Sequence, residues 1–226
     1  MMTSISLLKK NVGIVLEKKN LTKVKARVGL VIDISGSMRP LYKNGTVQRV
    51  VEKVLALASQ FDDDGILDVW LYDHRYTRLP SVSEEGFQNY VETQILQNDY
   101  IPKFGRNDEP PVMRDVIKKY IEEEPSKDPA YIVFINDGGV KRGKGDTIDK
   151  AVIDSSKYPV FWQFIGIGDN QFGVLEKLDT IDGRVVDNAN FFQINDIETL
   201  PDEELYEKLL FEFPDWLAAA KTAGIL

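Results

Sequence analysis

The sequence predicts an α/β protein built on a doubly wound, mainly parallel β-sheet with helices on both faces. Continuously apolar segments over residues 28–32, 131–135 and 160–167 have the pattern of strands that are buried on both faces. Amphipathic segments separate these strands along the chain, and strands that alternate with helices form parallel sheets. The 226 residues contain no internal repeat and no linker long enough to divide them, which favours one main domain.

The elements of the first half follow from the spacing of apolar residues. In segment 47–61 apolar residues recur at every third or fourth position, while Arg49, Glu52 and Lys53 fill the other face. This pattern is typical of a helix that packs on a sheet. The expected elements are a strand over 28–32, a helix over 47–61, a strand over 66–72, a weaker strand over 76–79, a helix over 87–96 and a helix over 110–121.

The second half continues the alternation. The strand over 131–135 is followed by Asn-Asp-Gly-Gly at 136–139, and the glycines allow a sharp turn. The expected elements are strands over 131–135, 160–167 and 190–193, and helices over 147–156, 172–178 and 202–213. In doubly wound sheets, ligands bind beyond the carboxyl ends of the strands, where the winding direction reverses. A ligand site is therefore expected just after these strand ends.

Composition excludes several classes of function. The net charge of −8 repels phosphate backbones, so nucleic-acid binding is not expected. The absence of cysteine excludes disulfides, thiolate zinc sites, iron–sulfur clusters and cysteine nucleophiles, and the single histidine, His74, excludes a multi-histidine metal site within one chain. No apolar run approaches the ~20 residues of a membrane span. Lysines interrupt every apolar stretch near the N-terminus, so we expect no signal peptide and a cytoplasmic location.

Oxygen-bearing side chains follow two of the buried strands. Asp33, Ser35 and Ser37 alternate directly after the first strand, so their side chains point the same way from an extended or gently turning backbone. Asp137 follows the strand over 131–135 and converges on the same place if the two strands are neighbours. Such hard oxygen donors suit Mg²⁺, Mn²⁺ or Ca²⁺ rather than zinc or copper. The alternative is a simple strand-to-helix loop in which serine and glycine are turn formers.

Residues 33–37 with the later Asp137-Gly138 resemble the metal-ion-dependent adhesion site of von Willebrand factor A (vWA) domains. Among vWA domains, the sequence is more similar to the bacterial branch associated with tellurite-resistance (Ter) stress proteins, of the TerF-like or TerY-like kind. The matching segments span about residues 26 to 217 in family order: 33–38, 42–48, 61–65, 161–164, 166–168, 175–179, 186–192 and 213–217.

The resemblance implies a six-stranded sheet with one short antiparallel edge strand. It also implies that Ser35 and Ser37 contact a divalent cation directly, and that Asp33 and Asp137 act directly or through ordered water. An acidic residue of a partner protein would complete the coordination. The implied partners are other proteins, among them components of Ter-type stress complexes.

The sequence departs from the family in the loop over residues 101–109, here called the middle loop. The family's Gly-x-Thr corresponds to Gly-Arg-Asn, which ends at Asn107. The carbonyl oxygen of Asn107 is a fair ligand for a hard metal, and Asp108 is an alternative ligand. Either residue can instead serve only to cap the helix that contains Pro110 and Pro111.

The resulting prediction is a divalent-cation-dependent protein-interaction module that is not an enzyme. Residues 26–226 form the vWA-like domain. Residues 1–25 form an N-terminal extension that is similar to the start of TerD-type domains and too short to hold one. The predicted metal ligands are Asp33, Ser35, Ser37, Asn107 and Asp137.

Two alternatives stay open at this point. One is a metal-dependent hydrolase or phosphoryl-transfer enzyme, because a carboxylate-bound Mg²⁺ also binds phosphates. Only Asp108, Glu109 and Asp169 are plausible further titratable groups for it. The other is a scaffold with a degenerate metal site. His74 beside Asp73 is a conceivable general base, but no nucleophile motif is tied to it, so a surface histidine is expected.

Overall fold

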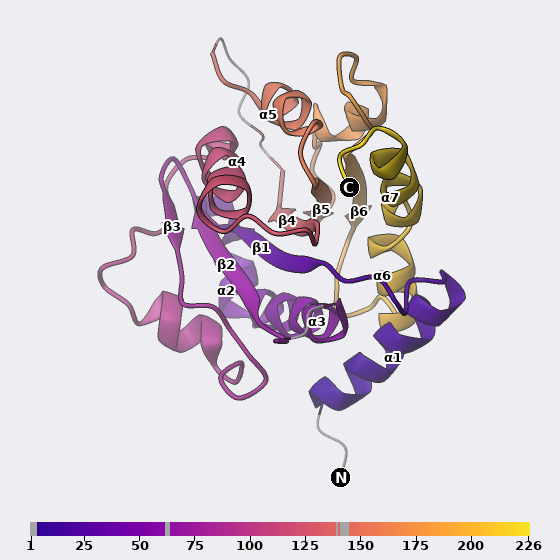
Figure 1. Ribbon diagram of the computed structural model, residues 1–226. Coiled ribbons are helices and arrows are strands. Elements are labelled where there is room, and N and C mark those ends of the chain that lie inside the picture. The colour runs from indigo at the N-terminus through magenta and orange to yellow at the C-terminus, as the bar shows by residue number, and fades with distance from the viewer. Residues whose placement is uncertain (1–3, 62–63, 139, 141–144) are drawn as a thin grey trace.

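A six-stranded sheet with the strand order β3-β2-β1-β4-β5-β6 runs through the centre of the protein (Figure 1). The structure is a computed structural model that describes residues 4–61, 64–138, 140 and 145–226. The strands are β1 (Arg27–Asp33), β2 (Leu67–Tyr72), β3 (Tyr76–Arg78), β4 (Ala130–Asn136), β5 (Val160–Ile167) and β6 (Ala189–Ile194). The helices are α1 (Ser4–Lys18), α2 (Arg39–Lys43), α3 (Thr46–Phe61), α4 (Glu109–Ile117), α5 (Ile148–Ser155), α6 (Asp202–Leu209) and α7 (Phe213–Thr222).

The predicted fold class is confirmed. All neighbouring strands pair in parallel except β2 and β3, which pair in antiparallel fashion at one edge. The winding reverses between β1 and β4, which are direct neighbours, with Ile32 opposite Ile135. The carboxyl ends of these two strands therefore meet at the switch point, where ligands of doubly wound sheets bind.

Helices cover both faces of the sheet, and side-chain alternation along β1 shows why. Leu30 and Ile32 contribute to the core beneath α1, α3, α6 and α7, whereas Val31 points into the core beneath α4 and α5. Figure 1 shows α4 and α5 on one side of the sheet and α1, α3 and α6 on the other. A strand with apolar residues on both faces must be buried on both, which explains its continuously apolar sequence.

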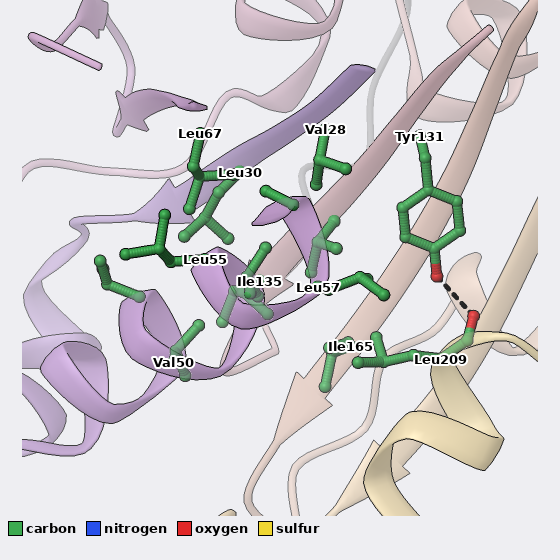
Figure 2. Close-up of a cluster of buried hydrophobic side chains, with 14 of the residues drawn as sticks. Val28, Leu30, Val50, Leu55, Leu57, Leu67, Tyr131, Ile135, Ile165 and Leu209 are labelled. Carbon is green, nitrogen blue, oxygen red and sulfur yellow. Dashed lines mark hydrogen bonds between the residues drawn. The ribbon is translucent and has the colours of Figure 1, made fainter. Parts of the chain in front are cut away.

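The larger core lies between α3 and the central strands. Figure 2 shows Val50, Leu55 and Leu57 of α3 pointing toward side chains of the sheet, among them Leu30. At the far side of this cluster the Tyr131 hydroxyl donates a hydrogen bond to the carbonyl oxygen of Leu209. The bond satisfies a phenol with no solvent exposure and fixes the end of α6 against β4.

Three helices, α1, α2 and α7, were not expected from the sequence. Helix α1 occupies part of the predicted extension, and its buried residues Ile5, Leu8, Val12 and Val15 recur at helical spacing and join the same core as α3. At the other end of the chain the predicted helix over 202–213 ends at Leu209, and α7 begins at Phe213, with Pro214 in its first turn. The division of the chain at residues 25 and 26 stays a prediction.

Other expected segments are shorter or less regular. The segment predicted as a helix over 87–96 forms a π-helical turn over Val91–Leu96, and that over 172–178 forms a 3₁₀ helix over Leu175–Thr180. A short helix, α2, precedes α3 where a loop was expected. Residues 62, 63 and 139, which were assigned to turns, lie outside the described residues. None of the helices in the described ranges is long and apolar enough to cross a membrane.

Candidate metal centre

Three strand ends bring acidic residues to one edge of the sheet. Asp33 is the last residue of β1, Asp73 directly follows β2, and Asp137 directly follows β4. Because these strands are parallel neighbours, their carboxyl ends lie side by side. Asp33 and Asp137 were expected here from the sequence, whereas Asp73 was not assigned to the site.

The structure brings the predicted serines and aspartates into hydrogen-bonding contact. The Ser35 and Ser37 hydroxyl oxygens lie 3.1 Å apart, and the Ser37 hydroxyl donates to Asp137 Oδ1 over 2.9 Å. The backbone N–H of Ser35 donates to Asp33 Oδ1 over 2.5 Å. Two hydroxyls and two carboxylates at the carboxyl ends of β1 and β4 and in the loops that follow thus form one continuous group of oxygen atoms. Their role as metal ligands stays a prediction.

Asn107 also belongs to this group. Its Nδ2 donates to Asp33 Oδ2 over 3.0 Å and lies 3.4 Å from the carbonyl oxygen of Gly138. The amide therefore faces Asp33 and is not turned toward the start of α4. Asp108 occupies the N-cap position of α4, and its side chain makes no capping hydrogen bond there. Of the two residues weighed for the middle loop, Asn107 is the one that reaches Asp33.

The burial of Asp33 disfavours the ionised form of its carboxyl group. Its side chain has no solvent exposure, and this burial raises its pKa to about 7, with further upward contributions from the charges of Asp137 and Glu109. The hydrogen bonds from Ser35 lower the pKa but do not cancel the effect of burial. Burial likewise raises the pKa of Asp137, although its hydrogen bond with Ser37 opposes the shift.

These residues fit a divalent cation. A buried carboxylate with a raised pKa lacks a compensating positive charge, and a cation beside Asp33 would supply it. Within the described part of the chain, no three His, Cys, Asp or Glu side chains gather as a ligand cluster. A cation at this edge would therefore depend on the hydroxyls of Ser35 and Ser37 together with the aspartates, a set of hard oxygen donors.

Asp73 fixes the middle loop. Its carboxylate Oδ2 accepts the N–H of Gly105 over 3.1 Å, and its carbonyl oxygen accepts the N–H of Asp108 over 2.9 Å. A side chain at Gly105 would put a Cβ atom 2.5 Å from Asp73 Oδ2 and 2.6 Å from His74 Nδ1, so only glycine fits. The signal that could have revealed Asp73 is its position directly after a strand, which it shares with Asp137.

Of the other residues considered from the sequence, Glu109 acts on this group through its charge, which raises the pKa of Asp33. His74 is exposed, and its Nδ1 lies 3.4 Å from Asp73 Oδ1, while Asp73 also binds the guanidinium of Arg75. Asp169 is exposed, whereas Glu109 is buried at the start of α4. Glu109 was considered as a titratable group near the site, but its burial and its electrostatic effect on Asp33 were not expected, because helix position alone does not reveal burial.

The group reaches the surface at Ser37 and is not deeply hollowed. Ser37 is exposed, whereas Asp33, Ser35 and Asp137 are buried, and the cavity lined by Ile34, Asp73 and Arg75 beside the site has a volume of about 10 Å³. Cavities of about 750 Å³ and 640 Å³ lie elsewhere, the first along β6 and α6 and the second at the start of α3. The candidate site is thus a rim that another molecule can approach from solvent.

Comparisons with known proteins agree with this architecture. Among solved structures, the chain is similar to proximal thread matrix protein 1 from the mussel byssus, with a TM-score of 0.58 and 15% identity, over 87% of this chain and 48% of that chain. Another structure of that mussel protein has a zinc-occupied MIDAS (metal-ion-dependent adhesion site) motif. It matches with a TM-score of 0.57 and the same identity and coverage. A von Willebrand factor type A protein from Catenulispora acidiphila matches with a TM-score of 0.53 and 16% identity, over 89% of this chain and 43% of that chain. The chain thus spans about half the length of these structures, and the likeness shows the fold.

Sequence comparison gives the family. The "Uncharacterized protein YcbR" of Bacillus subtilis (strain 168) is 61% identical over 225 residues, which cover 100% of this chain and 91% of the relative. Residues 25–226 match the vWA-TerF-like family, described as the vWA found in the TerF C terminus. The chain therefore belongs to the vWA-TerF-like family.

Proposed function

We propose that this protein is a divalent-cation-dependent protein-interaction module in which Asp33, Ser35, Ser37, Asn107 and Asp137 form the cation site. The continuous contacts from Ser35 through Ser37 to Asp137 are the observation that carries the proposal, because they place hydroxyl and carboxylate oxygens together at a point that reaches the surface at Ser37. Domains of the vWA family generally mediate protein interactions, which supports it. Mg²⁺ is the proposed cation, with Ca²⁺ and Mn²⁺ as the alternatives.

The contacts of the residues support the roles that we propose for them. Ser35 and Ser37 would hold the cation with neutral oxygens, and Asp33 and Asp137 would orient these hydroxyls or bind beside them. A cation held by few charged ligands remains attractive to a further carboxylate. The protein has a net charge of −8, so a bound cation would let an acidic partner approach this edge. A cytoplasmic, Ter-type stress-response complex is the proposed setting.

Removal of either serine hydroxyl should weaken cation binding. We expect Ser35→Ala and Ser37→Ala each to lower Mg²⁺ affinity at least about tenfold, since each removes an oxygen from the site. Isothermal titration calorimetry with Mg²⁺, Mn²⁺ and Ca²⁺ measures this. Ser81→Ala is a matched control, because the Ser81 hydroxyl also donates to a carboxylate, that of Asp68, over 2.7 Å but away from the site. The proposal fails if the wild type binds none of these ions at millimolar concentration.

Exchange of Asn107 tests the departure from the family. Asn107→Thr removes the amide nitrogen that donates to Asp33, which frees Asp33 Oδ2, and puts a hydroxyl oxygen in place of the amide oxygen. We expect Mg²⁺ to bind about fivefold more tightly, the effect of roughly one hydrogen bond. Calorimetry on both proteins decides the matter. Weaker binding by the threonine variant would show that Asn107 is already the adapted ligand.

Partner binding should depend on the cation. We expect EDTA to release a partner captured from the native host, and excess Mg²⁺ to restore the complex. Pull-down with and without EDTA, followed by mass spectrometry, tests this, with Ser37→Ala as bait in parallel. A complex that survives both EDTA and the substitution would mean that another surface binds the partner. Metal-dependent hydrolysis of a phosphoester that Asp33→Ala abolishes would instead favour an enzyme.

A further inference from the structure

The guanidinium of an exposed arginine stacks on an aromatic ring beside the candidate metal centre. The Arg39 guanidinium carbon lies 4.1 Å from the centroid of the Phe104 ring. Arg39 comes two residues after Ser37, and Phe104 comes three residues before Asn107. The pair therefore connects the two loops that carry the proposed cation ligands.

The ring beneath the guanidinium is firmly held. Phe104 has a positive φ of 64°, which is uncommon for a residue with a side chain, and its N–H donates to the carbonyl oxygen of Ile34 over 2.7 Å. The ring meets Tyr42 edge to face with 6.1 Å between centroids, and the Tyr42 hydroxyl donates to the carbonyl oxygen of Asp33 over 3.0 Å. Arg39 is thus positioned by the same backbone that positions Asp33.

The stacked guanidinium keeps its hydrogen-bonding edge. Stacking uses the flat face, whereas the N–H donors of arginine lie in the plane and match a carboxylate in bidentate geometry. Within the part of the chain that the structure describes, the Arg39 guanidinium makes no hydrogen bond or ion pair. Arg78 and Arg114 differ, because each binds a carboxylate of this chain, Asp115 over 2.6 Å and Asp146 over 2.8 Å respectively.

We propose that Arg39 is a second carboxylate-binding point beside the cation, so that the partner presents an acidic segment with two carboxylates, one for the cation and one for Arg39. The inference rests on the proposed function, because the first carboxylate needs the bound cation. Two nearby positive groups select a pair of acidic side chains over a single one. A guanidinium held in advance on Phe104 also loses little rotamer entropy when it binds.

Short acidic peptides test the proposal directly. The probes are acetylated and amidated peptides with two glutamates separated by one to three glycines, and versions in which either glutamate is glutamine. NMR titration in saturating Mg²⁺ gives their affinities. We expect the best two-glutamate peptide to bind the wild type about fivefold or more tightly than either single-glutamate version, as for one added charge-assisted contact.

Substitution of Arg39 should remove this preference alone. Arg39→Gln is expected to bind both kinds of peptide equally, with unchanged affinity for Mg²⁺ and for single-glutamate peptides. Lys43→Gln is the matched control, because Lys43 is an exposed cation on the same helix, α2, and it should keep the preference.

The outcomes separate this inference from the proposed function. If Arg39→Gln keeps the preference, or weakens both kinds of peptide equally, the second binding point is wrong while the cation site stands. If the wild type shows no two-glutamate preference in Mg²⁺, the inference is likewise wrong. If Mg²⁺ does not bind in calorimetry, or single-glutamate binding ignores EDTA, the proposed function fails first and the inference with it.

Discussion

Replacement of Asp33 by asparagine is expected to stabilise the metal-free protein at pH 8 and to abolish its Mg²⁺ binding. Asp33 has no solvent exposure, and burial raises its pKa from the ordinary 3.8 to about 7. A difference of this size corresponds to roughly 4 kcal/mol of cost for the ionised form in the folded protein. An asparagine carries no charge and keeps an oxygen that can accept the N–H of Ser35.

The pH dependence has a definite sign. Below about pH 4 Asp33 is protonated in both the folded and the unfolded chain, so its ionisation costs nothing. Between pH 4 and about 7 the unfolded chain releases the proton while the folded protein retains it, and the free energy of unfolding falls as pH rises. Above about pH 7 the whole cost is present. Asp33→Asn should remove most of this fall, leaving a smaller one from Asp137, whose pKa is also raised.

The measurement is thermal and urea unfolding from pH 4 to 8, with EDTA and with Mg²⁺. We expect Asp33→Asn to gain about 2 kcal/mol at pH 8 without metal, less than the full cost because charge-assisted hydrogen bonds are lost. The wild type should gain about 2.7 kcal/mol at Mg²⁺ concentrations 100-fold above Kd, and the variant nothing. Asp169→Asn, an exposed aspartate near the end of β5, is the control and should behave as the wild type. An asparagine variant less stable than the wild type at pH 8 in EDTA would contradict the prediction.

A charge on the buried face of α1 is expected to be strongly destabilising. Val12 has no solvent exposure and lies in the core shared with α3, so Val12→Asp buries an unpaired carboxylate. We expect the free energy of unfolding to fall by about 3 kcal/mol or more. Urea unfolding with Leu7→Asp as control measures this, since Leu7 lies on the same helix and is 50% exposed. Equal midpoints for the two variants would show that α1 does not contribute to the core in solution.

Periodicity predicted the central elements well because burial leaves a clear pattern. The strand predicted over 160–167 has the same bounds as β5, and the helix predicted over 47–61 differs from α3 by one residue. Helices α1, α2 and α7 were not predicted, although α1 buries residues at helical spacing. Local sequence predicts whether a segment is a helix or a strand. It does not predict which other element packs against the apolar face of that segment.

At the candidate site too, local sequence predicted some features, whereas others depended on distant segments. Alternation after a strand predicted that Asp33, Ser35 and Ser37 lie together, and their contact with Asp137 followed once β1 and β4 were neighbours. Sequence could not choose between capping and site roles for Asn107, because that depends on where a loop 74 residues from Asp33 passes.

By itself the sequence determined the fold class, the strands that end at the site, and the kind of oxygen donors gathered there, because these depend on residue type and spacing along one chain. Only the tertiary structure decided that Asp73 holds Gly105, that Glu109 is buried near Asp33, and that Arg39 stacks on Phe104. It also decided the raised pKa of Asp33. Burial and electrostatic interaction depend on which distant segments meet, and a linear sequence does not contain those distances.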